Sequence, residues 1–508
     1  MSRLSGIVLI AWGILSYCLH EWTSLRLPLL DWPCKYGDLG AWNCSFFVIG
    51  GVILVLMGGG RTLSPQSRLQ WRRFRSSRRG FVSFLILGVL VLLAMLDSLV
   101  VGSKAIAVRY EGRWSFPAFH AVPTTGDAFG LSNDARVNFR ELQQRFREEN
   151  KGNWVIMPPV PWDPVFDSDV SQTALVTKAA DGLYYREDQS QPYSGSARRY
   201  HDQERSQRFT EAGFRRGRLE GRFEAFLPDG TRLVTREYTH GEVTEESWAT
   251  GSDRTAYPLD AAEPAWVAAL YAPLPPSAKQ KHYLGTDSRG WDLAAQIFGG
   301  WQVNVQAGLF YLLLTYLVGI TIGCTMGYFG GTYDLTVQRI MEIMMNVPFL
   351  YLVVIIVSMV GRENVTVPKL IGIMAVFSWI GVAVYLRAST YRERERVFVG
   401  AAQVIGASHP RIIFRHILPN VLATIVTLIP FDVSGIIFSL TALAFIGFGL
   451  PDTFPSWGVI FDDGVDYLSS PWIASSAFAA MVVVLALITF VGEAIRDAFD
   501  PKKFAYYQ

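Results

Sequence analysis

Long apolar runs alternate with polar segments through most of this chain. Six runs are long enough to cross a hydrocarbon core of about 30 Å as helices: residues 81–101, 305–326, 343–360, 370–386, 421–446 and 472–491. Two shorter runs, 4–22 and 42–60, precede them. Because lipid offers no hydrogen-bond partners to the backbone, such runs must be helical. The pattern therefore predicts eight transmembrane helices.

A long polar segment separates the third and fourth of these runs. Val137, Phe139, Leu142 and Phe146 have imperfect helical spacing, which predicts a helix ending near Glu149. Residues 222–226 and 232–238 flank a turn signal, and 242–248 is a third β-prone run. We expect an extracytoplasmic α+β domain inserted into an otherwise all-α polytopic membrane protein, with the charge-rich residues 186–218 mobile.

Composition agrees with a membrane protein. Hydrophobic residues make up 50% of the 508 residues, charged residues only 18%, and mean hydropathy is +0.23. A soluble protein of this length rarely has such values. The first apolar run follows Arg3, as in a signal peptide, but no small-residue cleavage site follows it, so we expect an uncleaved N-terminus.

The basic residues predict the orientation in the membrane. Residues 61–79 carry seven arginines and no acidic residue, and residues 387–419 carry six arginines. By the positive-inside rule both loops are cytoplasmic. A nucleic-acid surface is the other interpretation of a basic loop, but a short loop between two apolar runs cannot present a groove to a duplex. Both termini are then cytoplasmic, and the large polar segment is outside.

Cysteine usage adds one candidate site. Of four cysteines, only Cys34 and Cys44 fall in a loop on the oxidising side, where they either form a disulfide or remain two unpaired thiols. No metal-ligand spacing is present, so we expect no metal site.

The second basic loop contains a candidate coupling motif. Gly400-Ala401-Ala402 is followed after three residues by Gly406, and then after nine residues by His416-Ile417-Leu418-Pro419. Two short helices joined at a glycine would form a rigid knob, and small alanine side chains would allow a partner protein to approach closely. An ordinary helix-turn-helix between two spans is the alternative.

This spacing resembles the coupling motif of ABC importer permeases, which is Glu-Ala-Ala, three residues, Gly, nine residues, Ile, one residue, Leu-Pro. Five residues match in register, whereas a glycine replaces the glutamate and a histidine the isoleucine. The resemblance implies that the ATPase-coupling residues are Gly400, Ala401, Ala402, Gly406, Arg415, His416, Leu418 and Pro419.

Further motifs follow the same family's order. Residues 284–287 (Leu-Gly-Thr-Asp), 445–450, 455–458 and 492–501 resemble signatures of dipeptide and oligopeptide permeases, although Trp291 stands where these usually have arginine. Residues 63–65, 108–114 and 153–155 resemble the YejE-type permeases of microcin C and oligopeptide uptake. The resemblance covers roughly 63–167 and 282 to the end, leaving 1–60 and much of 169–280 without a counterpart.

The resemblance implies a type I ABC importer permease, in the inner membrane of a bacterium, that takes up oligopeptides or microcin C-like compounds. Its partners would be a YejB-like second permease, a YejF-like ATPase and a periplasmic YejA-like binding protein that delivers the peptide. The chain has no Gly-x-x-x-x-Gly-Lys-[Ser/Thr] phosphate loop. We therefore expect no enzyme activity and no cofactor in this chain, with ATP and Mg²⁺ bound by the partner ATPase.

Two polar residues in the apolar runs are candidates for the translocation pathway, because polar groups are costly in a membrane. They are Asp432 and Asn346, beside Pro348. For Asp432 the alternatives are an interhelical hydrogen bond or an interfacial position.

Two other functions compete with a permease. A secondary transporter often carries internal repeats, and none is visible. A sensor that displays the outer domain would need no coupling motif.

We expect four regions: a two-helix extension (1–60), a basic segment with one helix (61–102), the periplasmic domain (103–283) and the permease core (284–508), with its coupling loop at 388–419.

Overall fold

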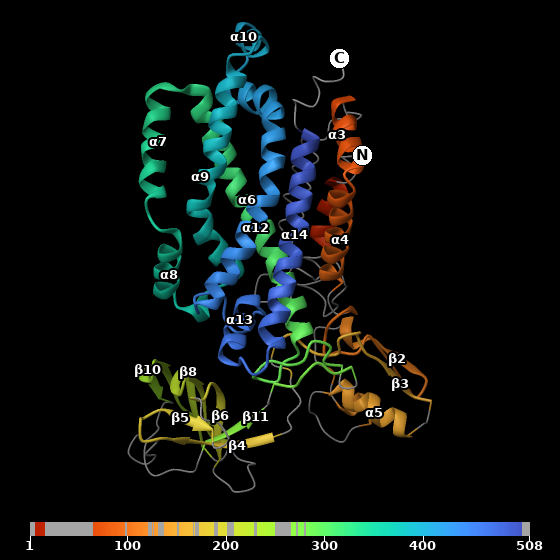
Figure 1. Cartoon of the computed structure of the whole chain (residues 1–508). Coiled ribbons are helices and arrows are strands. Elements are labelled where there is room, and N and C mark those ends of the chain that lie inside the picture. Colours follow the sequence, from red (N-terminus) through yellow and green to blue (C-terminus); the bar gives the residue numbers. More distant parts are fainter. Residues whose placement is uncertain are drawn as a thin grey trace. The chain divides into compact units, whose positions relative to one another are not determined.

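The computed structural model describes residues 6–15, 65–96, 99–119, 124, 126–130, 137–149, 152–165, 167, 172–186, 192–200, 208–227, 231–248, 266–270, 273–278 and 281–499 (Figure 1). The chain forms two compact units. The first comprises 1–166, 278–284 and 292–508, and the second 167–277 and 285–291. The polar segment 103–283 is thus divided between the two units.

The first unit is mainly helical. Its principal helices are α3 (Pro65–Ser76), α4 (Arg78–Met95), α6 (Leu293–Phe329), α7 (Gly331–Met345), α8 (Phe349–Val360), α9 (Val367–Arg394), α10 (Val397–Val404), α12 (Leu418–Phe445), α13 (Trp457–Asp466) and α14 (Trp472–Phe499). In the described part of the chain, four helices are long and apolar enough to cross a membrane, or six if each of two bent pairs is one span. This is a helical membrane-type domain.

The six long apolar runs fall mainly on these helices, with two differences. The run 81–101 extends beyond its helix, because α4 ends at Met95 and Val101 forms a β-bridge with Val160. The run 343–360 is not one straight helix, because α7 ends at Met345 and α8 begins at Phe349, with a bend of 76° between them. Pro348 explains the break, since proline lacks an N–H and disfavours helical geometry in the residue before it. Of the two early runs, residues Gly6–Leu15 form a helix, and 42–60 lies outside the described residues.

A row of glycines brings α6 against α9. Gly319, Gly323 and Gly327 recur every four residues, and each lacks space for a side chain. A Cβ at Gly323 would lie 2.6 Å from the carbonyl oxygen of Ala383, and one at Gly327 would lie 2.6 Å from that of Arg387. Small residues at this spacing let two backbones approach closely in a membrane. Figure 1 shows the two helices side by side in the bundle.

The other helices pack around this pair. Trp301 Nε1 donates to the Leu90 carbonyl at 3.0 Å and Gln302 Nε2 to that of Ala94 at 2.9 Å, which ties α6 to α4. α14 packs against α4, α12 and α13. The second bond satisfies the Ala94 carbonyl, which is one of the last four of α4 and has no partner within the helix.

A small sheet with one helix belongs to the same unit. The strands β1 (Ala107–Tyr110), β2 (Arg113–Ser115) and β3 (Trp154–Ile156) pair antiparallel in the order β2-β1-β3, and α5 (Phe139–Glu149) buries Phe139, Leu142 and Phe146. The predicted helix therefore ends at Glu149. It is capped by Asn138, whose Oδ1 accepts the Arg140 N–H at 3.1 Å.

The second unit is an eight-stranded antiparallel sheet in the order β10-β9-β8-β7-β6-β11-β4-β5. Its strands are β4 (Gln172–Lys178), β5 (Tyr184–Arg186), β6 (Gly195–Tyr200), β7 (Arg208–Arg215), β8 (Arg218–Phe226), β9 (Arg232–Thr239), β10 (Glu242–Trp248) and β11 (Trp266–Leu270). The three strands expected from the sequence are present as β8, β9 and β10.

Contrary to the expectation of a mobile segment at 186–218, its residues 195–200 and 208–215 form the strands β6 and β7. Ala197, Ala212 and Phe214 are buried in one cluster with Phe223 and Trp266. Along β6 the buried Ala197 and Arg199 alternate with Ser196 and Arg198, so the segment has the two-residue periodicity of a strand. Its high charge concealed that periodicity.

We predict that Gly323→Leu will prevent normal packing of α6 on α9. The new side chain would collide with α9 backbone, and even milder overpacking costs about 1–3 kcal/mol. Thermal unfolding of the detergent-solubilised protein should show a large fall in midpoint or no folded protein. Gly381→Leu on α9 is the control, because nothing lies within 4 Å of a Cβ there; equal stability of the two variants would contradict the packing argument.

Candidate functional site: the coupling loop

The predicted coupling loop forms a compact knob between α9 and α12. α10 is followed by the short helix α11 (His409–Arg411) and a π-helical turn, η6 (Ile412–Ile417), which leads directly into α12. Figure 1 shows α10 projecting beyond the ends of α9 and α12. π-helical turns are rare and occur frequently at functional sites.

Gly406 forms the turn at the end of α10. Its φ is +82°, in the left-handed region that favours glycine. Its N–H donates to the Gln403 carbonyl at 2.9 Å, and the next N–H, from Ala407, donates to that of Ala402 at 3.0 Å. These two bonds are the Schellman arrangement, which satisfies the last carbonyls of a helix. The glycine of the motif is therefore a helix-ending residue.

The inner face of the knob is part of the helical core. Val399, Ala402, Ile412, Ile413 and Ile417 are buried in one cluster that also contains residues of α6, α9 and α12. Ala402 faces inward and therefore does not form part of a partner-facing surface, whereas Ala401 is exposed and its contact with a partner stays a prediction. The two alanines point in different directions because adjacent helical residues lie on different faces.

The outer tip of the knob is apolar. Val397, Val404 and Ile405 have exposed fractions of 89%, 90% and 85%. None of the three was expected from the sequence, although three apolar residues in a charge-rich inner loop were a usable signal. Gly400 is also exposed, with nothing within 4 Å of a Cβ placed on it. Arg415 is exposed as well.

A second contact links the knob to the end of α6. Tyr328 Oη and His409 Nδ1 are 2.9 Å apart, and the His409 ring lies 5.5 Å from the rings of Tyr328 and Phe329. Gln403 Nε2 donates to Tyr328 Oη at 3.5 Å. Neither Tyr328 nor His409 was expected from the sequence, because 81 residues separate them.

The remaining motif residues begin α12. Pro419 lies in the first turn of the helix, where a missing N–H costs nothing. Leu418 packs on the same cluster as the inner face. His416, which replaces the family's isoleucine, is half-buried, and its carbonyl accepts the Asn420 side chain at 2.7 Å.

An ion pair holds α7 to α9 close to the knob. Arg387 donates to both carboxylate oxygens of Asp334, at 2.5 and 2.6 Å, and Tyr391 Oη donates to one of them at 2.7 Å. Asp334 is 3% exposed. Such bidentate pairs have a defined geometry, so they fix how the two helices meet.

The candidate pathway residues lie on different helices. Asp432 on α12 accepts a hydrogen bond of 2.5 Å from Tyr316 Oη on α6, so the interhelical bond considered as an alternative is present. Asn346 is exposed at the end of α7, and its amide donates to the Glu342 carbonyl at 2.7 Å. A role for either residue in translocation stays a prediction.

The other sequence candidates are placed as follows. Cys34 and Cys44 lie outside the described residues. The Gly-Thr-Asp signature is a turn in which buried Asp287 accepts from the Trp291 N–H at 2.8 Å and the Arg289 guanidinium at 2.8 and 2.9 Å. Asp292 caps α6 through the Ala295 N–H at 2.7 Å. Across the described ranges, no group of His, Cys, Asp and Glu is arranged to hold a metal.

Comparison with known families agrees with this helical core and loop. Residues 319–504 match the family described as the inner membrane component of binding-protein-dependent transport systems. The matched segment includes the knob and α9, α12 and α14. The fold and the site thus define an ABC importer permease subunit.

Two long relatives are similar along nearly their whole length. The peptidoglycan transport system permease protein YejE of Agrobacterium fabrum is 30% identical over 87% of this chain and 94% of the relative. The inner membrane ABC transporter permease protein YejE of Escherichia coli is 29% identical over 87% of this chain and 98% of the relative. The oligopeptide transport system permease protein OppC of Escherichia coli is 34% identical over 45% of this chain and 74% of the relative.

The chain belongs to the YejE-type family of ABC importer permeases. As a permease subunit it is not an enzyme. Membership implies an ABC transporter that also contains ATPase and permease partners.

We predict opposite effects for two glycine-to-alanine changes, one within α10 and one in the turn that follows it. Gly406→Ala forces a left-handed alanine and should destabilise the protein by about 1–2 kcal/mol. Gly400→Ala adds a methyl group in open space within a helix and should stabilise it by about 0.5–1 kcal/mol. Thermal unfolding measures both, and a tolerated Gly406→Ala would contradict the assigned turn.

Proposed function

We propose that this chain forms half of the transmembrane pathway of an importer for oligopeptides or peptide-like compounds, microcin C-type compounds included. The names of its relatives support this substrate class, since they refer to peptidoglycan and oligopeptide transport. Peptidoglycan fragments and oligopeptides share peptide bonds. The substrate would be delivered by a periplasmic YejA-like binding protein.

The coupling knob is the observation that carries the mechanism. Its tip exposes Val397, Val404 and Ile405, while its inner face is packed into the core. An exposed apolar cluster in a short inner loop favours burial against a partner. We propose that a YejF-like ATPase, which binds ATP and Mg²⁺, covers this tip, with Gly400, Ala401 and Arg415 at its edge.

The knob can transmit movement because its connections are rigid. η6 continues into α12 without a loop, and His409 contacts Tyr328 at the end of α6. Displacement of the tip by closing ATPases would therefore shift both helices. Alternating access would follow if α6 and α12 move relative to a YejB-like second permease.

The finer topology is also part of this proposal. We propose eight spans, with both termini in the cytoplasm and the large polar domain in the periplasm. The boundaries between the four regions of the chain would lie at residues 60, 102 and 283. Asp432 and Asn346 would line the pathway, Cys34 and Cys44 would be close enough to pair, and the chain itself would hold no cofactor. The basic loops at 61–79 and 387–419 support this orientation.

We predict that the double variant Val404→Asp/Ile405→Asp will fold but lose its ATPase. Two carboxylates in a desolvated apolar contact should reduce ATPase recovery at least tenfold, because truncating one interface hot spot alone costs about 2 kcal/mol or more. The measurement is copurification of the chain, expressed from its native gene neighbourhood, with the ATPase.

The control is Leu468→Asp. Leu468 is 78% exposed and follows α13, at the end of α12 opposite the knob. Its ATPase recovery should equal that of wild type. If the folded double variant kept its ATPase, docking at the tip would be wrong; loss in both variants would point to a general defect.

A further inference from the structure

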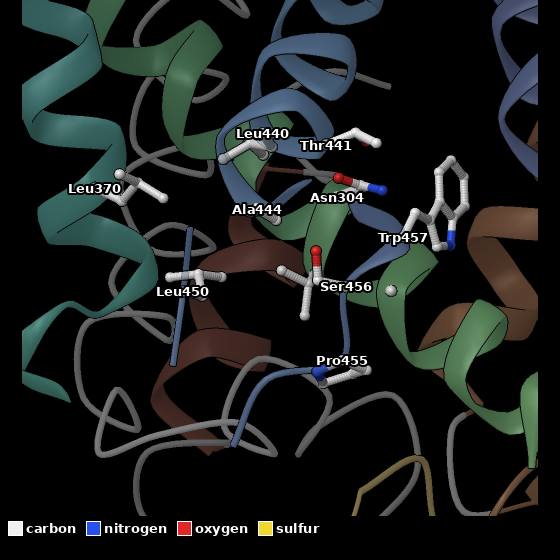
Figure 2. Close-up of a pocket in the computed structure, with 11 residues that line it drawn as sticks. Asn304, Leu370, Leu440, Thr441, Ala444, Leu450, Pro455, Ser456 and Trp457 are labelled. Carbon is white, nitrogen blue, oxygen red and sulfur yellow. The ribbon is translucent and has the colours of Figure 1, made fainter. Parts of the chain in front are cut away.

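A small cavity lies between α6, the first turn of α9, the last turns of α12 and the start of α13 (Figure 2). Its lining includes Asn304, Leu370, Leu440, Thr441, Leu450 and Ser456. Its volume is about 20 Å³, which is room for one ordered water or a group of that size. The cavity is at the end of α12 opposite the coupling knob.

Glycines give the cavity its shape. A Cβ at Gly300 would lie 2.6 Å from Trp457 Cδ1, and one at Gly458 would overlap the carbonyl oxygen of Thr441. Because both positions lack side chains, α13 sits directly against α6 and α12. The signature at 455–458, which the coupling function does not explain, thus builds one wall of this cavity.

The cavity contains a buried amide without a partner. Asn304 is 6% exposed, and within the described residues its side chain makes no hydrogen bond, in contrast to that of Gln302 one position before. The hydroxyl of Ser456, likewise, makes none there. Thr441 donates to the Ile437 carbonyl at 2.9 Å, which leaves its lone pairs free to accept. Because this amide lines the cavity and has no partner in the described part of the chain, it can bind a water or another polar group placed there.

The chemistry of the walls selects a neutral ligand. No residue lining the cavity is charged. Figure 2 shows Asn304, Thr441 and Ser456 near the centre, with leucines on one side and Trp457 on the other. Asn304 offers both a donor and an acceptor, which complements a group that also has both. A peptide amide has this property.

We propose that the Asn304 cavity is a docking subsite for one backbone amide of the transported peptide. The inference rests on the peptide transport proposed above. The carbonyl oxygen or the N–H of the amide enters a space of one water, and a water takes its place between transport cycles. Because the subsite binds the backbone of the peptide and has no room for a side chain, it accepts peptides of differing sequence.

The test uses the complete transporter with its partners, reconstituted in liposomes, and a tryptic digest of casein as the probe. Uptake of individual peptides is measured by mass spectrometry at saturating digest. Asn304→Leu should slow uptake about tenfold, which corresponds to loss of about 1.4 kcal/mol, and Ser456→Ala about threefold. ATPase recovery should not change in either variant.

Thermal unfolding without peptide separates this role from a structural one. Replacing an unpartnered buried amide by leucine should leave the midpoint equal or higher. Ser358→Ala is the matched control for Ser456→Ala, because Ser358 is on α8, is exposed and only donates to the Val354 carbonyl. Its uptake should equal that of wild type.

Each outcome decides a separate point. If wild type takes up no peptide while retaining its ATPase, the proposed peptide transport is wrong and the subsite with it. If wild type transports peptides and Asn304→Leu does so within twofold, the subsite alone is wrong and the cavity holds water only. If Asn304→Leu does not fold, Ser456→Ala decides, and unchanged uptake there overturns the subsite.

Discussion

The close approach of α6 to α9 is the constraint on which the helical unit depends. It requires bare backbone at Gly319, Gly323 and Gly327, because α9 carbonyl oxygens and side chains occupy the space where a Cβ would be. In lipid, helices associate through such packing, since apolar side chains gain little by leaving an equally apolar solvent. Once α6 is held in this way, its 37 residues form one continuous element from the Asp292 cap to Gly330.

Three polar sites of the helical unit lie along α6. Near its start Asn304 faces the small cavity, at its middle Tyr316 bonds to Asp432 of α12, and at its end Tyr328 meets His409 of the knob. A continuous helix transmits displacement along its axis, because its hydrogen bonds do not stretch easily. The knob and the cavity therefore lie along one continuous helix, α6.

The polar groups of the helical unit that are buried or partly buried include two kinds. Asp334 and Asp432 each have partners on a neighbouring helix, so they hold helices in register. Asn304 instead faces a cavity with no partner among the described residues. Since polar groups in a membrane are costly unless satisfied, the first kind explains architecture and the second indicates a ligand.

From the amino-acid sequence we could predict the long apolar helices apart from the break before Phe349, the strands β8 to β10, and the knob with its turn at Gly406. These features depend on local periodicity and on backbone conformations that only certain residues adopt. Four features came from the folded structure: Ala402 faces inward, the charged residues 195–200 and 208–215 form strands, Asp432 pairs with Tyr316, and Asn304 has no partner among the described residues. Each of these depends on residues far apart in the chain, whose proximity is set by packing and has no local signature.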